Sequence, residues 1–399
     1  MKTTILILGT VFAFLLAACS ESDKDVKFTT VTVQTQMPEE YNSLAGDGLT
    51  VTLTNTSTNR GVSGTTDTDG KWSTLVEEGV YHIKVAGEKL STTDTVGAIT
   101  LRFQASKQSQ SIAGLEQTVI LDMEYSETGS PWLIKELYFA GSKTPADKNY
   151  QKDQFIEIFN NSDDTLYADG LAIGETYITT SVVSAGRWGQ FLPDRIAVQA
   201  YYSIPGNGKD YPVAPGKSVV IANKALNHKG DESLNPNSPV DLSNANFEWV
   251  DANAPDIDVP EVPNLIKNFC YTETIWVLNQ QGTKSYIIFR PDKDVETFMN
   301  ENFVQVPNAS GSKQLDGYAI PRTLVFDGVE LSKKDGLKVK ALPSSIDAGY
   351  SYTDASGNGK SVRRKVERWE NGRAYLQDTN NSSDDFVTGQ TPTPFVIPQ

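Results

Sequence analysis

The sequence predicts an all-β protein, and three observations carry that prediction. Short runs of β-branched and aromatic residues alternate with clusters of Gly, Asn, Asp and Pro along almost the whole chain. Apolar and polar residues alternate cleanly in residues 49–53 and 81–85, which is typical of strands with one buried face. After the first twenty residues no long apolar pattern has a helical period, and only residues 292–302, which follow Pro291, favour a short helix.

The first eighteen residues are typical of a secretion signal. Lys2 supplies a positive start, residues 5–18 form an apolar run, and small residues precede Cys19. The run is shorter than the roughly 20 residues that a membrane span needs. The Leu-Ala-Ala-Cys sequence resembles the bacterial lipobox, which implies cleavage before Cys19 and attachment of acyl chains such as palmitate to its sulfur. We therefore expect a signal peptide over 1–18 and a lipid anchor at Cys19; a plain signal peptide or a short membrane anchor is the alternative.

An acidic tether, residues 19–27, follows the expected cleavage point. Its acidic residues after a lipidated cysteine resemble the export signal of Bacteroides-type surface lipoproteins. That resemblance implies a protein anchored in the outer membrane and facing the cell surface. The alternative is a merely solvated tether, because charged linkers repel themselves and extend.

Composition excludes several functions. The formal net charge of −15 disfavours nucleic acid as a partner, because such binding needs clustered positive charge. A basic cluster at residues 363–373 has interleaved glutamates, so we interpret it as a paired strand surface. If Cys19 is lipidated, Cys270 has no partner for a disulfide and is expected to be a buried, inert thiol. The length of 399 residues allows two or three domains.

The first predicted domain covers residues 28–125. Asp69-Gly70 is a strong tight-turn signal between strands, and Trp72 and Tyr81 follow at short spacing. This pattern resembles the transthyretin-like (carboxypeptidase-regulatory-like) modules of surface lipoproteins. The resemblance implies a small β-sandwich that acts as a spacer or docking module. A calcium loop over residues 67–78 is the alternative to a hairpin turn, although Trp72 occupies a position where a ligand is usual.

The second predicted domain covers residues 131–399. Residues 153–173, 211–222 and 364–394 resemble successive segments of the lamin-tail domain, whose fold is an immunoglobulin-like β-sandwich. The chain departs from that family by long insertions at residues 173–211, 223–268 and 302–362. As a whole it resembles Bacteroides-type lipoproteins with no established function, which are often encoded beside outer-membrane β-barrel receptors.

A search for catalytic chemistry finds none. The chain lacks nucleophile, phosphate-loop, dinucleotide and histidine-zinc motifs, so we expect no enzyme activity, no cofactor and no metal. Paired carboxylates are abundant, which leaves an acid-dependent hydrolase as a weaker alternative. His228 lies in a turn-like Asn-His-Lys-Gly sequence and is expected to be exposed, with assistance to a metal or haem as the other possibility.

The predicted binding surface is the insertion at residues 175–211. Its aromatic residues suit recognition of a glycan, a small ligand or a protein, unless they cover a small core of the insertion itself. We predict a surface lipoprotein that binds a ligand or docks on an outer-membrane receptor; the alternative is an adhesive protein that binds host glycans. Two Asp-Thr-apolar triplets resemble O-glycosylation acceptors. The predicted ligand- or partner-binding residues are Trp188, Phe191, Tyr201 and Tyr202, and the predicted glycosylated residues are Thr95 and Thr165.

Overall fold

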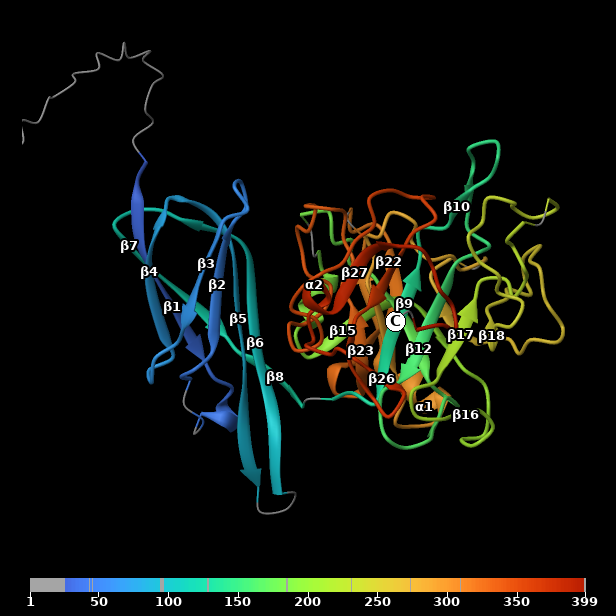
Figure 1. Cartoon of the computed structure of the whole chain (residues 1–399), viewed down its shortest axis with the longest axis horizontal. Coiled ribbons are helices and arrows are strands. Elements are labelled where there is room, and N and C mark those ends of the chain that lie inside the picture. The colour runs from blue at the N-terminus through green and yellow to red at the C-terminus, as the bar shows by residue number, and fades with distance from the viewer. Residues whose placement is uncertain are drawn as a thin grey trace, which may run out of the picture.

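The chain folds into two β-rich units that are joined near residue 128 (Figure 1). The computed structural model describes residues 26–397 except 43, 45, 94–96, 128, 184, 185, 231, 273 and 309. The predicted all-β class is confirmed, because strands in several sheets make up most of the regular structure. The expected short helix is also present as α1, Val295–Asn302, whose first turn is capped by Asp294. The Asp294 carboxylate accepts a hydrogen bond from the Thr297 backbone N–H at 3.0 Å.

The N-terminal unit consists of two sheets packed face to face. A three-stranded sheet has the order β4-β1-β7, and a five-stranded sheet has the order β3-β2-β5-β6-β8. The β5–β6 hairpin extends beyond the neighbouring strands (Figure 1). The strands are β1 (Phe28–Gln36), β2 (Thr50–Asn55), β3 (Gly61–Thr65), β4 (Lys71–Glu77), β5 (Gly79–Thr93), β6 (Gly97–Ile112), β7 (Glu116–Asp122) and β8 (Glu124–Glu127); a 3-10 helix, η1, covers Glu39–Tyr41.

The core of this unit follows from the alternation seen in the sequence. Every second residue of β1 is buried from Thr29 to Thr35, and Leu53 and Ile83 face them from the other sheet. Each strand therefore contributes one apolar face to a single core and exposes the other face to solvent.

The second unit also has two large sheets. The six-stranded sheet has the order β18-β17-β12-β9-β24-β27, and the seven-stranded sheet has the order β21-β22-β15-β14-β20-β23 with β19 paired to β15. The strands of the first are β9 (Trp132–Tyr138), β12 (Phe155–Asn160), β17 (Ser218–Ala222), β18 (Phe247–Glu248), β24 (Ser361–Arg364) and β27 (Phe386–Gln390). Those of the second are β14 (Ala172–Thr176), β15 (Arg195–Ser203), β19 (Ile266–Cys270), β20 (Tyr286–Phe289), β21 (Phe303–Pro307), β22 (Gln314–Pro321) and β23 (Val325–Val329).

Short elements complete this unit at the edges of the two sheets. Three two-stranded ladders pair β10 with β11, β13 with β16, and β25 with β26. Their bounds are β10 (Ser142–Lys143), β11 (Asn149–Tyr150), β13 (Leu166–Tyr167), β16 (Pro212–Val213), β25 (Val366–Glu370) and β26 (Arg373–Leu376), and the short helices are η2 (Trp188–Phe191), η3 (Arg322–Leu324) and α2 (Ser382–Asp385).

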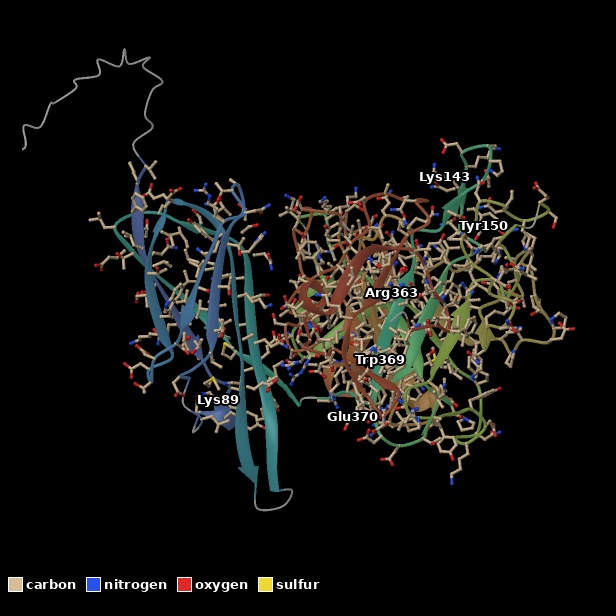
Figure 2. All side chains as sticks on the ribbon, viewed as in Figure 1. Lys89, Lys143, Tyr150, Arg363, Trp369 and Glu370 are labelled. Atoms are coloured by element: carbon tan, nitrogen blue, oxygen red, sulfur yellow. The ribbon has the colours of Figure 1, made fainter. Side chains whose placement is uncertain are left out.

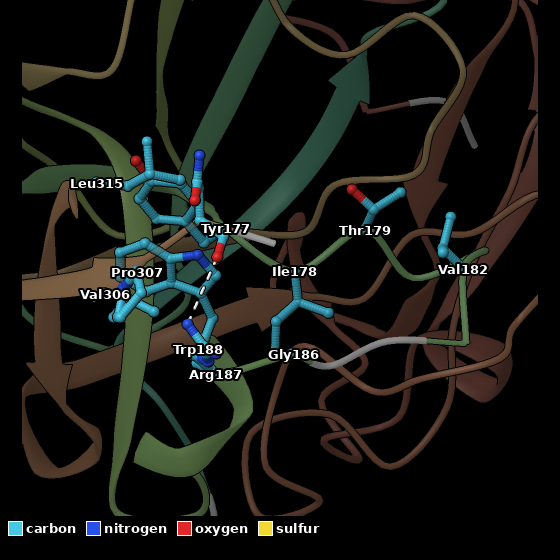
Figure 3. Close-up of a pocket in the computed structure, with 11 residues that line it drawn as sticks. Tyr177, Ile178, Thr179, Val182, Gly186, Arg187, Trp188, Val306, Pro307 and Leu315 are labelled. Carbon is cyan, nitrogen blue, oxygen red and sulfur yellow. Dashed lines mark hydrogen bonds between the residues drawn. The ribbon is translucent and has the colours of Figure 1, made fainter. Parts of the chain in front are cut away.

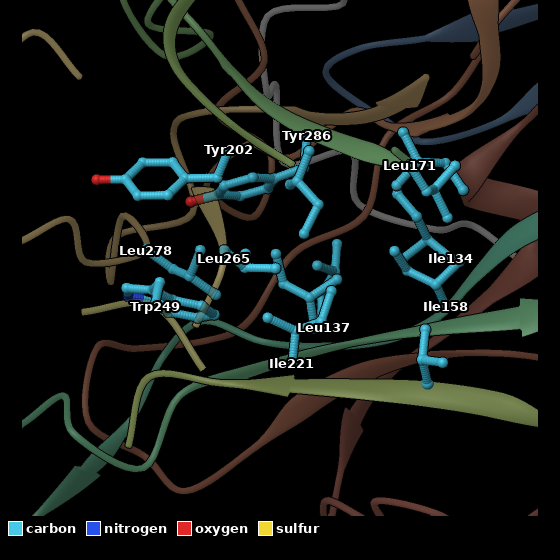
Figure 4. Packing of buried hydrophobic residues seen from close by; sticks show 14 of the residues in the cluster. Ile134, Leu137, Ile158, Leu171, Tyr202, Ile221, Trp249, Leu265, Leu278 and Tyr286 are labelled. Carbon is cyan, nitrogen blue, oxygen red and sulfur yellow. The ribbon is translucent and has the colours of Figure 1, made fainter. Parts of the chain in front are cut away.

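The main core of the second unit lies between its two large sheets (Figure 4). Ile134 and Ile221 come from the six-stranded sheet, and Tyr202 and Tyr286 come from the seven-stranded sheet. Both sheets also carry apolar clusters on their outer faces, one around Phe155 and one that includes Phe298 of α1. The central strands are therefore covered on both faces.

The structure corrects the expected insertion at residues 173–211. Its C-terminal half contains β15, which lies between β14 and β22 in the seven-stranded sheet. Residues 177–194 before β15 and residues 204–211 after it lie outside the strands of this sheet. The sequence contains no strand signal over residues 195–203, because β15 is buried at almost every position and its residues do not alternate between apolar and polar.

Polar contacts join the two units. The Arg102 guanidinium donates to the Asp378 carbonyl oxygen at 2.5 Å, and the Arg322 guanidinium donates to the Tyr125 carbonyl oxygen at 2.9 Å. The Ser345 backbone N–H donates to the Glu124 carboxylate at 2.8 Å. These contacts hold the β6–β8 edge of the N-terminal unit against the second unit.

Candidate functional site

The four predicted binding residues separate into two pairs in the structure. Trp188 and Phe191 form the two ends of η2, and both side chains are partly exposed. Tyr201 and Tyr202 lie on β15 with 0% and 1% of their surface exposed. Only the first pair is therefore placed where a ligand can reach it.

Tyr201 and Tyr202 belong to the interior, which corrects their assignment to a recognition surface. Consecutive strand residues point to opposite faces of a sheet. Tyr202 accordingly stacks on Trp276 in the main core, with ring centroids 4.7 Å apart. Tyr201 faces the outer cluster, where it packs against Phe289 at 5.1 Å and the α1 residue Phe298 at 6.1 Å. Both tyrosines support the sheet that carries the pocket described next.

Trp188 forms one wall of a pocket together with Tyr177 (Figure 3). The two rings are stacked with a centroid distance of 3.7 Å and an interplanar angle of 7°. They lie against Gly317 of β22, where an added Cβ atom would come within 2.9 Å of both rings. The Tyr177 hydroxyl donates to the Asp316 carbonyl oxygen at 2.7 Å. The glycine thus lets a flat aromatic pair rest directly on the strand.

The pocket has a volume of about 440 Å³ and lies between the 177–188 segment and the β21–β22 hairpin. The Arg187 guanidinium donates to the Asn308 carbonyl oxygen at 3.5 Å and so links the two sides (Figure 3). The remaining walls of the pocket are largely apolar, and its eleven lining residues include no carboxylate, histidine or cysteine. The site, here called the Trp188 pocket, offers a flat aromatic surface and a cationic edge, which suits binding rather than acid–base chemistry. The lining residues are Tyr177, Ile178, Thr179, Val182, Gly186, Arg187, Trp188, Val306, Pro307, Asn308 and Leu315.

The other predicted sites have different positions. Cys19 and Thr95 lie outside the described residues. Thr165 is exposed in the turn that precedes β13. The Asp67 carboxylate accepts hydrogen bonds from the backbone N–H groups of Asp69 and Lys71, both at 2.9 Å. These bonds are those of a tight hairpin turn, which is the first of the two alternatives for this loop.

The prediction of an exposed His228 is wrong. Its side chain is fully buried. Its Nδ1 atom lies 2.8 Å from the Tyr150 hydroxyl, and its Nε2 atom lies 3.0 Å from the Lys224 carbonyl oxygen. The composition around His228 indicates a turn, but it contains no signal that Tyr150, 78 positions earlier, contacts the histidine ring. Cys270, in contrast, is buried as expected.

The basic cluster at residues 363–373 is a paired surface, as predicted, except that one arginine is buried. Arg363 lies 3.8 Å from Glu136, and Arg373 lies 2.7 Å from Asp163. Arg364 is buried and forms ion pairs with Asp327, Asp378 and Asp385 at 2.5–3.6 Å. Because carboxylates occupy these guanidinium groups, the cluster is not free to bind phosphate.

Comparison with known proteins finds a similarity in the second unit. Residues 214–393 match the family model described as "Protein of unknown function (DUF4876)". The match covers less than half of the chain and is a similarity over that segment. The chain is also similar to a DUF4876 family protein from Bacteroides thetaiotaomicron VPI-5482, whose crystal structure is known. The identity is 25%, the match covers 93% of this chain and 98% of that chain, and the TM-score is 0.60.

The matched segment, residues 214–393, includes one side of the Trp188 pocket, residues 306–315, whereas Tyr177 and Trp188 precede it. No protein in the curated set matches the chain. Within the described part of the chain, no helix has the length and hydropathy required to cross a membrane.

Proposed function

We propose that this protein is a non-enzymatic lipoprotein of the outer-membrane surface that captures a small ligand in the Trp188 pocket. The observation that carries the proposal is the stacked Tyr177–Trp188 pair, which forms a wall of a cavity large enough for a small ligand. A partly exposed aromatic pair on a rigid strand loses little conformational entropy on binding. It therefore provides contact area at low cost.

The chemistry of the pocket favours a ligand with one flat or weakly polar face and polar edges. The aromatic pair would contact the face, while Arg187 and Asn308 would hydrogen-bond to the edges. A glycan unit and a planar aromatic molecule both have this character. The adhesive alternative uses the same pocket, with the glycan belonging to a host surface.

The anchoring part of the proposal rests on the sequence. Acyl chains on Cys19 would hold the protein in the membrane, and the acidic residues that follow would direct it to the cell surface. The N-terminal unit would then space the second unit from the membrane or dock on a β-barrel receptor. The transthyretin-like and lamin-tail-like assignments of the two units remain predictions.

A glycan array tests the binding role directly. Full-length protein is compared with Trp188→Ala and with Trp369→Ala, which removes an exposed tryptophan on the β25–β26 hairpin away from the pocket (Figure 2). We expect the first variant to lose at least tenfold in affinity for the recognised glycan and the second to keep it, because truncation of a central aromatic often costs 2 kcal/mol or more. Equal affinities in the two folded variants would exclude the Trp188 pocket as the binding site.

Membrane fractionation tests the anchor. The Cys19→Ala variant should leave the membrane fraction or accumulate as an uncleaved precursor, because it lacks the lipobox cysteine that is expected to receive the acyl chains. A mature variant protein that still sediments with membranes would contradict the lipoprotein assignment.

A further inference from the structure

A second cavity lies beside the seven-stranded sheet and is lined mainly by polar side chains. Its volume is about 460 Å³. An amide side chain offers both a hydrogen-bond acceptor and donors, so a wall of amides can pair with many hydroxyl groups at once. The six amide residues are Asn149, Gln151, Gln199, Asn279, Gln280 and Gln281.

Glu175 forms the floor of this cavity and is almost fully buried. The Gln199 amide donates to one of its carboxylate oxygens at 2.6 Å, and the Tyr286 hydroxyl donates to the other at 2.8 Å. Burial raises the pKa of Glu175, although these hydrogen bonds and Lys284 oppose the shift. These two hydrogen bonds fix the Glu175 carboxyl group. The bond from Gln199 also orients the Gln199 amide, which lines the cavity.

Lys284 brings a largely buried ammonium group to the same cavity. It donates to the Tyr177 carbonyl oxygen at 2.6 Å. Among the described residues no carboxylate lies within 4.0 Å of it, whereas buried lysines elsewhere in this unit, such as Lys135, are paired at 2.6 Å. Burial lowers the pKa of Lys284 to about 8, so the group is still mostly charged at neutral pH. The Glu175 carboxyl acts on Lys284 from beyond ion-pair distance and already accepts two hydrogen bonds. An anionic ligand group within ion-pair distance would give the largely buried ammonium group a direct, charge-assisted partner.

Tyr271 contributes an exposed ring to the wall. Its side chain is 53% exposed, and its backbone N–H donates to the Gln199 carbonyl oxygen at 2.8 Å. The cavity therefore combines amides, an ammonium group that has no carboxylate within 4.0 Å among the described residues, and an accessible aromatic face.

We infer that this cavity is a binding site for an acidic sugar, in which the ligand carboxylate pairs with Lys284, its hydroxyls bond to the amides, and its C–H face packs on Tyr271. The site is separate from the Trp188 pocket, with which it shares no lining residue. Lys284 contacts the backbone of Tyr177, which lines that pocket, so binding at the two sites is distinguished by Trp188→Ala, which should leave glucuronate binding unchanged.

Calorimetric titration of the full-length protein with glucuronate and with glucose tests this inference. We expect glucuronate to bind at least tenfold more tightly than glucose at pH 7. Lys284→Met should abolish that preference while leaving any glucose binding within about twofold, because only the charged contact is lost. Lys338→Met, which removes an exposed lysine elsewhere in the unit, should change neither affinity.

Tyr271→Ala provides a second arm in case Lys284→Met fails to fold. This variant alters an exposed ring and should weaken glucuronate binding several-fold without lowering the melting temperature. The inference is overturned if neither sugar binds, or if glucuronate and glucose bind equally. It is also overturned if folded Lys284→Met or Tyr271→Ala keeps the full affinity for glucuronate.

Discussion

The two units share a fold class but differ in where they place charged groups. In the N-terminal unit, β1 alternates between buried and exposed residues, and its ion pairs lie at the surface. In the second unit, every residue of β9 and β12 is buried. The buried polar side chains of the N-terminal unit, among its described residues, are all uncharged: Thr29, Thr35, Asn55, Thr66 and Gln104.

The difference follows from what covers the outer faces of the sheets. Apolar clusters lie on both outer faces in the second unit, so charged residues on a central strand cannot reach water. Lys135 of β9 instead pairs with Glu157 of β12 at 2.6 Å, and each is at most 1% exposed. Lys89 of the N-terminal unit pairs with Asp47 at the same distance, but that carboxylate is 46% exposed. On β9 and β12, which are covered on both faces, this lysine and this glutamate are therefore stabilised as a matched pair.

Breaking the buried pair should have the largest effect. Lys135→Met leaves the Glu157 carboxylate buried without its cation, which should lower the free energy of unfolding by about 3–5 kcal/mol. Lys89→Met, in the N-terminal unit (Figure 2), should cost much less because water solvates Asp47. Urea denaturation of both variants measures the difference.

The matching double variant sharpens this test. Lys135→Met combined with Glu157→Leu removes both charges and should recover most of the loss, since apolar groups of similar volume replace a buried pair at little cost. If Lys135→Met and Lys89→Met lose the same amount of unfolding free energy, burial of the ion pair does not distinguish the two units.

A change of pH should act on the second unit through Asp153. Burial raises the pKa of this carboxyl to about 6, although Ser142, Ser238 and Tyr138 donate hydrogen bonds to it. The folded state then binds the proton more tightly than the unfolded chain. The unfolding free energy should therefore rise as pH falls from 7 to 4, by up to about 3 kcal/mol from this group.

The Asp153→Asn variant isolates this contribution, because an amide resembles the protonated carboxyl. Its unfolding free energy should rise less than that of the unaltered protein between pH 7 and pH 4. Urea titrations at both pH values measure the difference, and parallel pH profiles for the two proteins would contradict the assignment.

The smallest expected effect concerns the turns of the N-terminal unit. Gly70 has a φ of +72°, and a Cβ atom there would lie 2.5 Å from the Thr35 hydroxyl oxygen. Gly48 has a φ of +69° with nothing within 4 Å of that position. Alanine at either position should cost about 1–2 kcal/mol for the left-handed backbone, and Gly70→Ala should cost more because of the contact. Thermal melting of both variants compares the two costs. Equal decreases in melting temperature would show that contact with the Thr35 hydroxyl adds nothing to the cost at Gly70.

Local features of the fold were predictable from the sequence alone. The alternation of residues 49–53 and 81–85 corresponds to β2 and β5, and the Asp69-Gly70 signal corresponds to the turn before β4. The short helix near residues 292–302 was also predictable. Each depends on residues within a few positions of one another, where backbone preference and pattern decide the conformation.

The candidate site could be predicted only in part. Trp188 was identified because aromatic residues in a glycine-rich segment favour recognition. Tyr201 and Tyr202 lie in the same segment of the sequence, but they are buried. The sequence contained no signal that Glu175 and Lys284 share a cavity, because Glu175 lies in a strand and Lys284 lies in a loop more than 100 residues later. No local pattern reports that such residues become neighbours.

By itself the sequence determined the β class, the strands with one wet face, the tight turns and the expectation of a lipid anchor. Only the tertiary structure decided that β15 is a central strand, that His228 is buried, and that residues 177–188 and 306–315 enclose a pocket. The reason is physical: turns and amphipathic strands arise from neighbouring residues, whereas burial on both faces and the walls of a cavity arise from strands paired across long stretches of the chain.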